Sequence, residues 1–421
     1  MAKSDFKHPY DVIIVGGGAA GLAASIFIMR QTCGVSTAIL EKSPRTGRKL
    51  LATGNGTCNL SNFHTTPACY HGDLSFAKHA LNSFLPEKTC EFFNSIGVEC
   101  TVRENGRIYP ICKHAGAVLD CLRLEMAALG AHEICDAEVL DIEATDSAFK
   151  LKTATGYFSA RYVLVCTGGM ASPSLGGSPD AYRLLTSLGH TRTTLFPSIV
   201  QVRTDTQFIK ALKGIRVDAS ISFLHEGRCL AEYKGEILFT EYGLSGPAVM
   251  QISRAVAEWE LKKQGRMVAV IDLIPQMDYA DLIKSLRRRL AMPGRTMGDV
   301  LTGLLQKRVG QTVIRSAGFS LNMQTESLSD GDIELIAKQI KQFKAQVLGT
   351  RGMAGAQVTA GGISTAEFNP TTMQSKIVPN LYAAGEVLNV DGDCGGFNLQ
   401  WAWASANLAS KAIVKSLQAL S

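Results

Sequence analysis

The sequence predicts an α/β fold in which a Rossmann-like domain, split into two sequence segments, is interrupted by an inserted β unit that carries a helical subdomain. Three observations predict this fold. A β-α-β pattern with a glycine-rich turn opens the chain, a β-meander followed by an apolar strand comes next, and a second glycine-rich zone with a long helix closes the chain. We expect the Rossmann-like domain over residues 1–195 and 353–421, the inserted β domain over 196–275 and the helical subdomain over 276–352.

The opening pattern predicts a turn that binds a dinucleotide. Val12–Val15 is an apolar, β-branched run of the kind that forms a strand buried on both faces. Gly16, Gly18 and Gly21 follow it in the spacing G-x-G-x-x-G and lead into a helical pattern. These glycines permit a tight turn, a close backbone approach to a pyrophosphate and close helix packing, while the free N–H groups at the helix start attract phosphate charge. Glu41, which ends the second apolar run, is suited to accept hydrogen bonds from ribose hydroxyls.

Composition excludes several classes of protein. With 421 residues, 46% of them hydrophobic and 19% charged, the chain has the composition of a soluble protein with two or three domains. The uncharged stretch Val12–Met29 has three consecutive glycines, which favours the β-α-β pattern over a membrane span or a signal sequence. Eleven cysteines without a C-x-x-C pair indicate a reducing, cytoplasmic location, and the spacing of histidines and cysteines matches no metal site.

The net charge of +6 does not by itself indicate a nucleic-acid partner. The sharpest basic cluster, Lys284–Arg289, alternates with leucine and isoleucine at helical spacing. Such a cluster is typical of a solvated helix face, so we expect a small-molecule substrate rather than nucleic acid, and no membrane partner. The sequence leaves the oligomeric state open.

The polar, glycine-rich stretch Lys42–Asn62 has two interpretations. Its glycines admit backbone contacts, and the adjacent cations Arg48 and Lys49 offset phosphate charge, so it is suited to cradle an extended anionic cofactor. A plain surface loop would have the same composition, and composition alone does not decide between the two.

The middle of the chain predicts helices, short strands and then the meander. The meander, the apolar strand and the glycine pair occur in the same order as in FAD enzymes of the two-dinucleotide-binding type. In that order, Glu138 and Val139 would approach the adenine, and Thr167–Gly169 would pass the phosphate side. The predicted elements are a helical pattern over Leu74–Ile96, strands over Val98–Val102 and Arg107–Tyr109, a helix over His114–Leu129, the meander over His132–Ala160 and a strand over Arg161–Cys166.

The inserted unit begins where the character of the sequence changes, at Phe196-Pro197. Segments rich in β-formers come first, and three or four helical patterns follow. We expect this unit to cover the cofactor and to shape a substrate pocket. Its predicted strands lie in Ser198–Thr204, Ile215–Leu224 and Arg266–Ile274, and its predicted helices include Tyr279–Ala291 and Asp332–Val347.

The closing zone predicts contacts with the flavin end of the cofactor. Leu381–Ala384 is a short apolar strand, and Gly385-Glu386 follows it where a chain passing under a ribityl group needs a small residue and an acceptor. Gly395-Gly396 then opens a helix over Leu399–Leu417. The N-terminal dipole of that helix stabilises negative charge on a reduced flavin by about 0.3–2 kcal/mol, which favours accepting a hydride. The alternative for the glycine pair is a bend between two packed elements.

With these residues together, the chain resembles the HI0933-like family of FAD-binding flavoproteins, also met under the names BaiN-type and aminoacetone-oxidase-type. The resemblance implies an FAD-binding domain in two parts, with a β-barrel-like insert and a helical subdomain. The chain departs from the family at Thr57, Cys394 and Phe397, where the family usually has arginine, threonine and tyrosine. The matching stretches are DVIIVGGGAAGLAA, EK..RTGRKLLATGNGTCNLSN, CTGG, GLSGPAVMQIS, VTAGGIS and LYAAGEVLNVDGDCGGFNLQWAWAS.

The residues and the resemblance together predict one set of cofactor-binding positions and FAD as the cofactor. The sequence names no catalytic acid or base. The predicted positions are Gly16, Gly18, Ala19, Ala20, Gly21, Glu41, Lys42, Arg48, Lys49, Gly54, Asn55, Cys58, Asn59, Val139, Thr167, Gly168, Gly385, Glu386, Gly396, Asn398 and Leu399.

The function that we expect is an FAD-dependent oxidoreductase, which moves a hydride between a small organic substrate and the flavin. The chain has one strong G-x-G-x-x-G, which argues against a permanent NAD(P) domain, so NAD(P)H would dock transiently as the donor. The alternatives are an FAD-dependent amine oxidase that uses oxygen and, from another class, an RNA-modifying flavoprotein or a flavin-binding protein without turnover.

Overall fold

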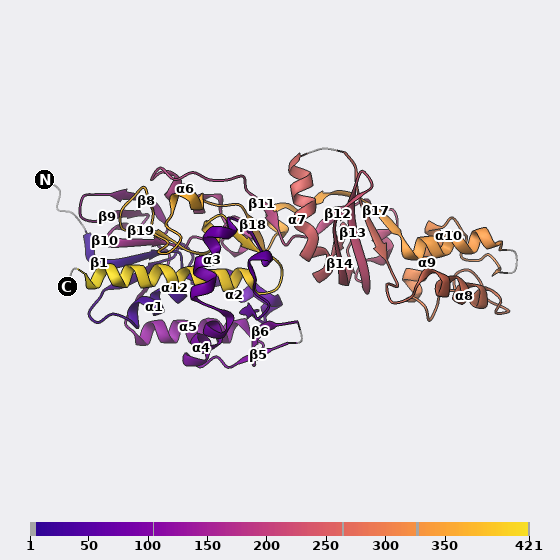
Figure 1. Ribbon diagram of the computed structural model, residues 1–421, viewed down its shortest axis with the longest axis horizontal. Helices are drawn as coiled ribbons and strands as arrows, with labels where there is room; N and C mark the ends of the chain where they lie inside the picture. The colour runs from indigo at the N-terminus through magenta and orange to yellow at the C-terminus, as the bar shows by residue number, and fades with distance from the viewer. Residues whose placement is uncertain (1–5, 104, 263–264, 326–327, 420–421) are drawn as a thin grey trace. The chain divides into compact units, whose positions relative to one another are not determined.

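The computed structural model describes residues 6–103, 105–262, 265–325 and 328–419 of a chain that divides into two compact units (Figure 1). The first comprises Met1–Phe196 with Gln357–Ser421, and the second comprises Pro197–Ala356. The first is a mixed α/β unit on a Rossmann-like sheet, and the second contains a closed barrel and helices. The predicted fold class is confirmed.

A seven-stranded sheet organises the first unit, in the order β7-β2-β1-β10-β9-β8 with β19 paired to β10. β1 runs parallel to β2 and β10, and β19 runs parallel to β10. Val12–Val15 and Val163–Val165 are buried, which explains why these strands are uninterrupted apolar runs. The strands are β1 (Phe6–Val15), β2 (Thr37–Leu40), β7 (His132–Ile134), β8 (Val139–Ala144), β9 (Phe149–Thr153), β10 (Gly156–Val165) and β19 (Leu381–Ala383).

The predicted meander is wrong in two respects. β7 pairs in parallel with β2, so it is an edge of the parallel sheet and not part of the meander. The predicted break between Ala160 and Arg161 is absent, because β10 is one strand from Gly156 to Val165. Its first half pairs antiparallel with β9 on one side, while β1 pairs in parallel along the other side. One strand thus ends the meander and continues into the parallel sheet.

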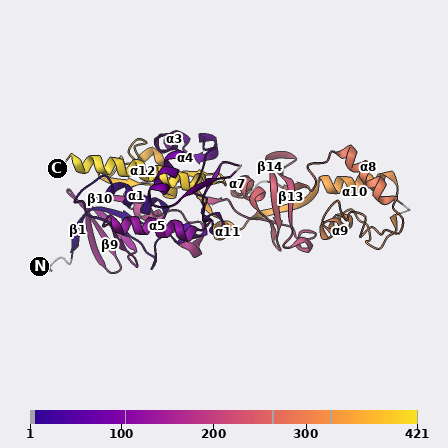
Figure 2. The same ribbon diagram turned by 90° about the horizontal axis from the view of Figure 1, so that it is seen from below.

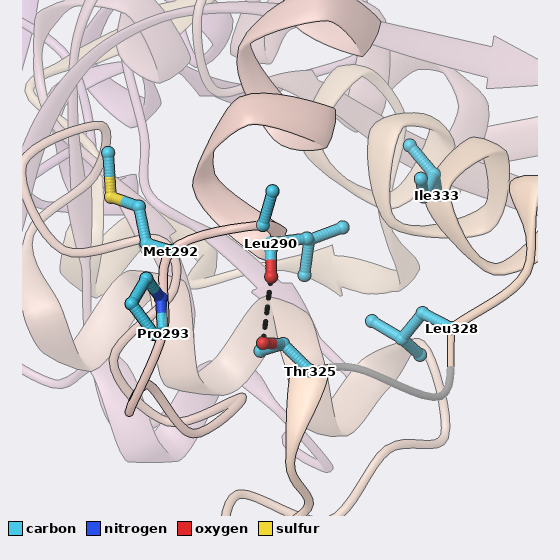
Figure 3. Close-up of a pocket in the computed structure, with 7 residues that line it drawn as sticks. Leu290, Met292, Pro293, Thr325, Leu328 and Ile333 are labelled. Atoms are coloured by element: carbon cyan, nitrogen blue, oxygen red, sulfur yellow. Dashed lines mark hydrogen bonds between the residues drawn. The ribbon is translucent and has the colours of Figure 1, made fainter.

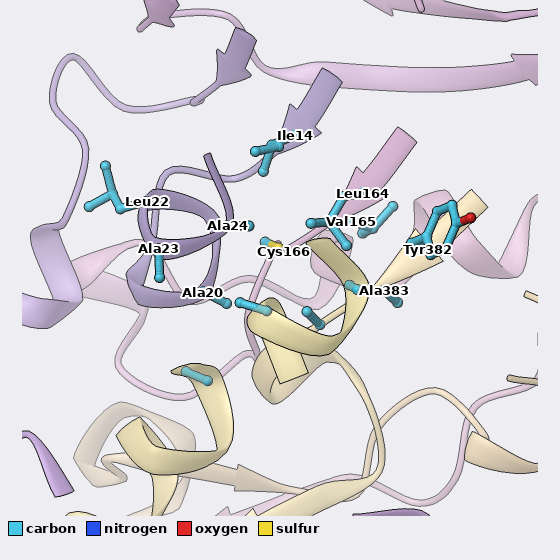
Figure 4. Packing of buried hydrophobic residues seen from close by; sticks show 14 of the residues in the cluster. Ile14, Ala20, Leu22, Ala23, Ala24, Leu164, Val165, Cys166, Tyr382 and Ala383 are labelled. Atoms are coloured by element: carbon cyan, nitrogen blue, oxygen red, sulfur yellow. The ribbon is translucent and has the colours of Figure 1, made fainter. Parts of the chain in front are cut away.

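Helices from opposite ends of the chain pack together on this sheet. α1 (Ala19–Met29) and α12 (Phe397–Gln418) lie side by side, as Figures 1 and 2 show, and the Ser410 hydroxyl donates to the carbonyl of Ala24 at 3.3 Å. Both helices bury alanines at the contact, which lets their backbones approach closely. Figure 4 shows side chains of α1, of the ends of β1 and β10, and of β19 gathered in one core.

The predicted helical pattern over Leu74–Ile96 is two helices rather than one. Pro86 stands in the first turn of the second helix, where its missing N–H costs no hydrogen bond, and Phe84 before it is not helical. The remaining elements are α2 (Arg48–Ala52), α3 (Leu74–Ser83), α4 (Pro86–Ser95), α5 (Ala115–Ala128), α6 (Arg183–Thr186), β3 (Ser61–Asn62), β4 (Tyr70–Gly72), β5 (Cys100–Val102), β6 (Arg107–Pro110), β11 (Phe196–Ser198), β18 (Val358–Ala360) and β20 (Val390–Gly392).

The second unit contains a closed barrel in the order β12-β15-β14-β13-β16-β17. Its pairings are antiparallel, and β12 closes the barrel by pairing with β17. Alternate residues of β13, such as Ala219, Ile221 and Phe223, are fully buried, so side chains fill the barrel. The strands are β12 (Val202–Thr204), β13 (Arg216–His225), β14 (Arg228–Phe239), β15 (Gly243–Ser245), β16 (Met267–Asp272) and β17 (Phe343–Thr350).

The predicted helix over Asp332–Val347 is wrong beyond Lys341. Residues Phe343–Thr350 form β17, whose alternating buried residues face the barrel core. The helices of this unit are α7 (Pro247–Lys262), α8 (Tyr279–Leu290), α9 (Lys307–Ser316), α10 (Asp330–Lys341) and the short α11 (Gly352–Gly355).

No helix within the described ranges combines the length and the apolar character that crossing a membrane requires. All eleven cysteines are free thiols. Among the residues that the structure describes, no three His, Cys, Asp or Glu side chains gather to hold a metal ion.

Candidate cofactor-binding site

The turn after β1 has the backbone geometry that a pyrophosphate requires. Gly16 has a φ of +104°, and a Cβ there would lie 2.5 Å from a carbonyl oxygen just after β10. A Cβ at Gly21 would lie 2.0 Å from the Gly16 carbonyl oxygen, whereas no atom lies within 4 Å of a Cβ built on Gly18. No side chain caps α1. The first turn, with Ala19 and Ala20, therefore presents backbone N–H groups to open space.

Glu41 is fixed beside this turn at the end of β2. Its Oε2 accepts the N–H of Gly17 at 2.8 Å, and its Oε1 accepts the N–H of Ser43 at 2.8 Å. The Glu41 carbonyl accepts the N–H of Ala137 at 2.9 Å, which brings the start of β8, with the buried Val139, to the same place. Each carboxylate oxygen keeps a lone pair for a ribose hydroxyl.

The loop after Glu41 is held against the glycine turn. The N–H of Gly47 donates to the Gly17 carbonyl at 2.8 Å, and α2 starts at the next residue. Arg48 Nη2 donates to the carbonyl of Ser174 at 2.9 Å. Lys42 is exposed, and its side chain forms no hydrogen bond or ion pair with another described residue. These contacts make the loop one wall of the site.

The second half of this loop carries a buried amide that fits a ligand. Gly54, Asn55 and Cys58 all have φ values between +53° and +57°, so the chain turns sharply here. Burial raises the pKa of Cys58 to about 12, so its thiol is neutral and no nucleophile. Asn59 is 8% exposed, its Oδ1 has no hydrogen-bond partner among the described residues, and a Cβ on Gly396 would lie 2.8 Å from that oxygen. An unpaired buried oxygen costs about 1–3 kcal/mol, so a donor on a bound cofactor would stabilise it.

An ion pair joins this loop to the C-terminal segment. Lys49 Nζ lies 2.7 Å from Glu386 Oε2, and the two side chains are 32% and 20% exposed. Glu386 Oε1 also accepts the N–H of Thr359 at 2.8 Å. The Thr359 hydroxyl oxygen accepts the N–H groups of Met170 and Ala171 at 3.0 and 2.9 Å. Segments from three parts of the chain are thereby fixed around one carboxylate.

The turn after β10 leaves room on one side. Thr167 donates from its hydroxyl to the carbonyl of Ala181 at 2.8 Å. Gly168 has a φ of +72°, and no atom lies within 4 Å of a Cβ built there. A Cβ on Gly169 would lie 2.5 Å from the Thr359 hydroxyl oxygen. The open side at Gly168 is consistent with a cofactor passing the turn.

Gly385 and Gly396 bring the C-terminal segment against the start of the chain. A Cβ on Gly385 would lie 3.1 Å from the Cβ of Ala20, and the Gly385 N–H donates to the Ser405 hydroxyl at 2.9 Å. Gly396, with a φ of +100°, is the N-cap residue of α12, and a Cβ there would lie 2.5 Å from the carbonyl oxygen of Ser61. No side chain caps α12. Its N-terminus is therefore a second source of free backbone N–H groups.

Asn398 holds the turn that precedes α12. Its Oδ1 accepts the N–H of Gly392 at 2.8 Å, and its Nδ2 donates to the Gly392 carbonyl at 2.6 Å. Both polar ends of the side chain are thus used within the turn, so Asn398 positions the helix start. Leu399, which follows it, is partly buried.

These observations fit FAD. The N-termini of α1 and α12 lack a capping side chain, a Cβ at Gly18 or Gly168 would face open space, and the buried Oδ1 of Asn59 has no donor among the described residues. The first helix end suits the pyrophosphate, and the second suits the electron-accepting edge of the flavin ring.

Three features of the site were not predicted from the sequence. Thr359 lies in VTAGGIS, a stretch that carries the family resemblance without indicating a role. Tyr182 is buried next to Glu386 and Thr359, and burial, followed by the charge of Glu386, raises its pKa. His71 Nε2 lies 2.8 Å from Asp393 Oδ1, between residues 322 positions apart. The pairing of β4 with β20 joins them, and no spacing signal predicts that pairing.

A cavity in the second unit is a weaker candidate for chemistry. It encloses about 400 Å³ and lies at the C-terminal end of α8 (Figure 3). The Thr325 hydroxyl on its wall already donates to the carbonyl of Leu290 at 2.8 Å. None of the described residues that line the cavity has a titratable side chain, so these residues offer no group for acid–base chemistry. The lining residues are Leu290, Ala291, Met292, Pro293, Thr325, Leu328 and Ile333.

Comparison with known proteins identifies relatives that span almost the whole chain. Residues 10–412 match the family described as HI0933-like protein Rossmann domain. A 3-dehydro-bile acid delta(4,6)-reductase of Clostridium scindens is 35% identical over 401 residues, which cover 95% of this chain and 98% of the relative. A ribosomal RNA dihydrouridine synthase of Escherichia coli is 30% identical over 403 residues, which cover 94% of this chain and 96% of the relative.

Among solved structures, the fold is similar to that of a 3-ketosteroid delta1-dehydrogenase from Sterolibacterium denitrificans. The TM-score is 0.51 with 12% identity, and the match covers 97% of this chain and 100% of that chain. At this identity the likeness is one of fold alone.

Proposed function

The chain belongs to the HI0933-like family, and from that premise we propose that it reduces a carbon–carbon double bond conjugated to a carbonyl group. It is an FAD-dependent oxidoreductase, as the sequence predicted. The names of two relatives support the finer statement. A 3-dehydro-bile acid delta(4,6)-reductase and a dihydrouridine synthase both saturate a double bond that is conjugated to a carbonyl group.

The observation that carries the proposal is that α1 and α12, helices from opposite ends of the chain, pack side by side and that neither has a capping side chain. Gly385 lies between them, because a Cβ there would lie 3.1 Å from the Cβ of Ala20 and its N–H donates to the Ser405 hydroxyl of α12. We assign the cofactor to this place, and hence to the segments 1–195 and 353–421. FAD, when bound, supplies hydride transfer between a donor and the electron-poor carbon of the double bond.

The protein's own groups bind and orient. The N–H groups at the start of α1 stabilise the pyrophosphate, and Glu41 accepts hydrogen bonds from ribose hydroxyls. Asn59 Oδ1 accepts a hydrogen bond from the cofactor, and the ion pair of Lys49 with Glu386 fixes the wall beside it. The N-terminus of α12 stabilises negative charge by about 0.3–2 kcal/mol.

Saturating the double bond also requires a proton at the carbon next to the carbonyl group. His71 on β4 pairs with Asp393, which lies in the turn that leads into α12, and the two side chains are 33% and 28% exposed. We infer that His71 holds this proton and that Asp393 orients the ring. His71→Gln should slow substrate reduction and change its pH profile, whereas His79→Gln, an exposed histidine on α3, should change neither.

NAD(P)H is the donor that we propose, and it docks transiently. One experiment tests both halves of the reaction. The purified protein with FAD is mixed anaerobically with NADPH or NADH, and the flavin absorbance is followed; a 3-oxo-4,6-diene steroid or a uridine-containing RNA is then added. We expect bleaching by the nicotinamide and recovery of the colour with one of the two acceptors.

Two outcomes contradict the proposal. If amines bleach the flavin and nicotinamides do not, the protein is an amine oxidase. If neither nicotinamide bleaches the flavin and neither acceptor restores it, the protein binds FAD without this turnover.

A further inference from the structure

Two cysteines of the first unit lie together although no short spacing in the sequence marks them. Cys90 lies on α4, and Cys100 is the first residue of β5. α4 and β5 pack together, and both cysteines are partly buried at the edge of the main hydrophobic core. Nine residues separate the two in the sequence, so they form no C-x-x-C pair.

The end of α4 leads the chain directly into β5. The N–H of Gly97 donates to the carbonyl of Asn94 at 3.0 Å, and the N–H of Val98 donates to the carbonyl of Phe93 at 2.9 Å. With Gly97 at a φ of +84°, these two bonds form a Schellman motif, which ends a helix in a left-handed turn. The strand that follows packs against the helix that it left.

Two hydrogen bonds hold Cys100 beside Cys90. The Cys100 N–H donates to Asn94 Oδ1 at 3.3 Å, and Asn94 lies one turn after Cys90 on the same face of α4. The Cys100 thiol donates to the Cys90 sulfur. This second bond lowers the pKa of Cys90, because it stabilises the thiolate, and it raises the pKa of Cys100, which keeps its proton.

We propose that Cys90 and Cys100 form a redox-active dithiol, which hydrogen peroxide oxidises to a disulfide. Thiols that already share a hydrogen bond need little movement to reach the about 2.05 Å of an S–S bond. Because both side chains are only partly buried, a small oxidant reaches them. Two thiols that merely filled space at the edge of the core would be inert toward peroxide. The dithiol goes beyond the proposed reduction of a double bond and does not depend on it.

The oxidation takes two steps. The Cys90 thiolate attacks one oxygen of hydrogen peroxide, the O–O bond breaks, and Cys90 becomes a sulfenic acid while hydroxide leaves. The Cys100 sulfur then attacks the Cys90 sulfur, the S–O bond breaks, and water leaves. The proton of the Cys100 thiol neutralises the hydroxide. The two sulfurs together lose two electrons, and one peroxide molecule is reduced to water.

The test treats the full-length protein with FAD with a small excess of hydrogen peroxide. The remaining thiols are blocked with N-ethylmaleimide in urea, and the tryptic peptides are weighed without reduction. Both cysteines lie on the peptide Thr89–Arg103. We expect this peptide to lose two hydrogen atoms and both maleimide labels, and to regain both labels if dithiothreitol is added before blocking. The exposed Cys33 should keep its label at the same dose.

Single variants distinguish the two thiols. Cys100→Ser should stop the reaction at the sulfenic acid of Cys90, which dimedone then labels. Cys90→Ser should leave Cys100 with its maleimide label, because the attacking thiol is gone. Cys121→Ser is the matched control, since Cys121 is another partly buried cysteine of the first unit, on α5. It should leave the disulfide unchanged.

Two results on the wild-type protein would overturn the proposal. The first is a peptide Thr89–Arg103 that keeps both labels while Cys33 is oxidised. The second is equally fast formation of the disulfide in folded protein and in protein unfolded in urea, since nearness in the sequence would then explain it. The readout is a mass, so failure of the proposed function is visible separately, as a flavin that no nicotinamide bleaches.

Discussion

Replacing Gly18 with alanine should separate folding from cofactor binding. Gly18 has a φ of −81°, which alanine adopts without strain, and no atom lies within 4 Å of the added Cβ. Gly18 is the N-cap residue of α1, where alanine is less favourable than glycine, so the free energy of unfolding should fall by at most about 1 kcal/mol. The folded protein without FAD should therefore melt close to the wild-type temperature.

The same methyl group projects into the open space in front of α1. If the pyrophosphate lies there, the methyl group prevents at least one backbone N–H from reaching it. A hydrogen bond to a charged group contributes about 1.5–3 kcal/mol. Since about 1.4 kcal/mol is a factor of ten, the Kd for FAD should rise about ten- to hundredfold.

Quenching of FAD fluorescence on titration with apoprotein measures this Kd, and thermal melts without FAD measure folding. Gly331→Ala is the control, because Gly331 lies in the first turn of α10 and the nearest atom to its added Cβ is 3.7 Å away. The control should gain about 0.5–1 kcal/mol of stability and bind FAD like the wild type. An unchanged Kd in a folded Gly18→Ala protein would refute the placement of the pyrophosphate.

Three further predictions follow from burial and pairing. Iodoacetamide should alkylate the exposed Cys33 in the folded protein and spare Cys58, whose pKa burial raises to about 12; equal labelling in peptide mass spectra would contradict this. Burial lowers the pKa of His190 below 6.5. The contribution of His190 to the free energy of unfolding should therefore be complete above that pH and fall as the pH drops below it. Thermal melts of His190→Gln should show a flatter pH dependence, and an unchanged slope would count against the argument. A double-mutant cycle of Lys49→Met and Glu386→Gln in urea should give a coupling free energy of about 0.5–3 kcal/mol, and zero coupling would argue against the ion pair.

The glycine turn and its flanking strands could be predicted from the sequence because their constraints are local. Glycine is required at Gly16 and Gly21 because a Cβ at either position would overlap a backbone carbonyl oxygen. Glu41 follows the neighbouring parallel strand. The resemblance to a family also located the C-terminal segment that carries Gly385 and Gly396. Local geometry and motif together predicted the fold of this part of the chain, and its contact with FAD stays a prediction.

Other features depend on contacts that the sequence does not encode locally. Ile336, Ile340, Phe343 and Val347 are spaced by four, three and four residues, which is helical spacing, yet the last two belong to β17. Barrel closure overrides that local pattern. The pairing of His71 with a carboxylate 322 residues away exists because two short strands meet, and neither strand has a sequence signal of its own.

The most direct test of the central claim is a titration of the apoprotein with FAD, followed by visible absorbance and by melting temperature. We predict a yellow complex with one FAD per chain and a stabilisation of about 2.7 kcal/mol when free FAD is about a hundredfold above its Kd. A protein that stays colourless and melts at the same temperature with and without FAD would contradict the claim.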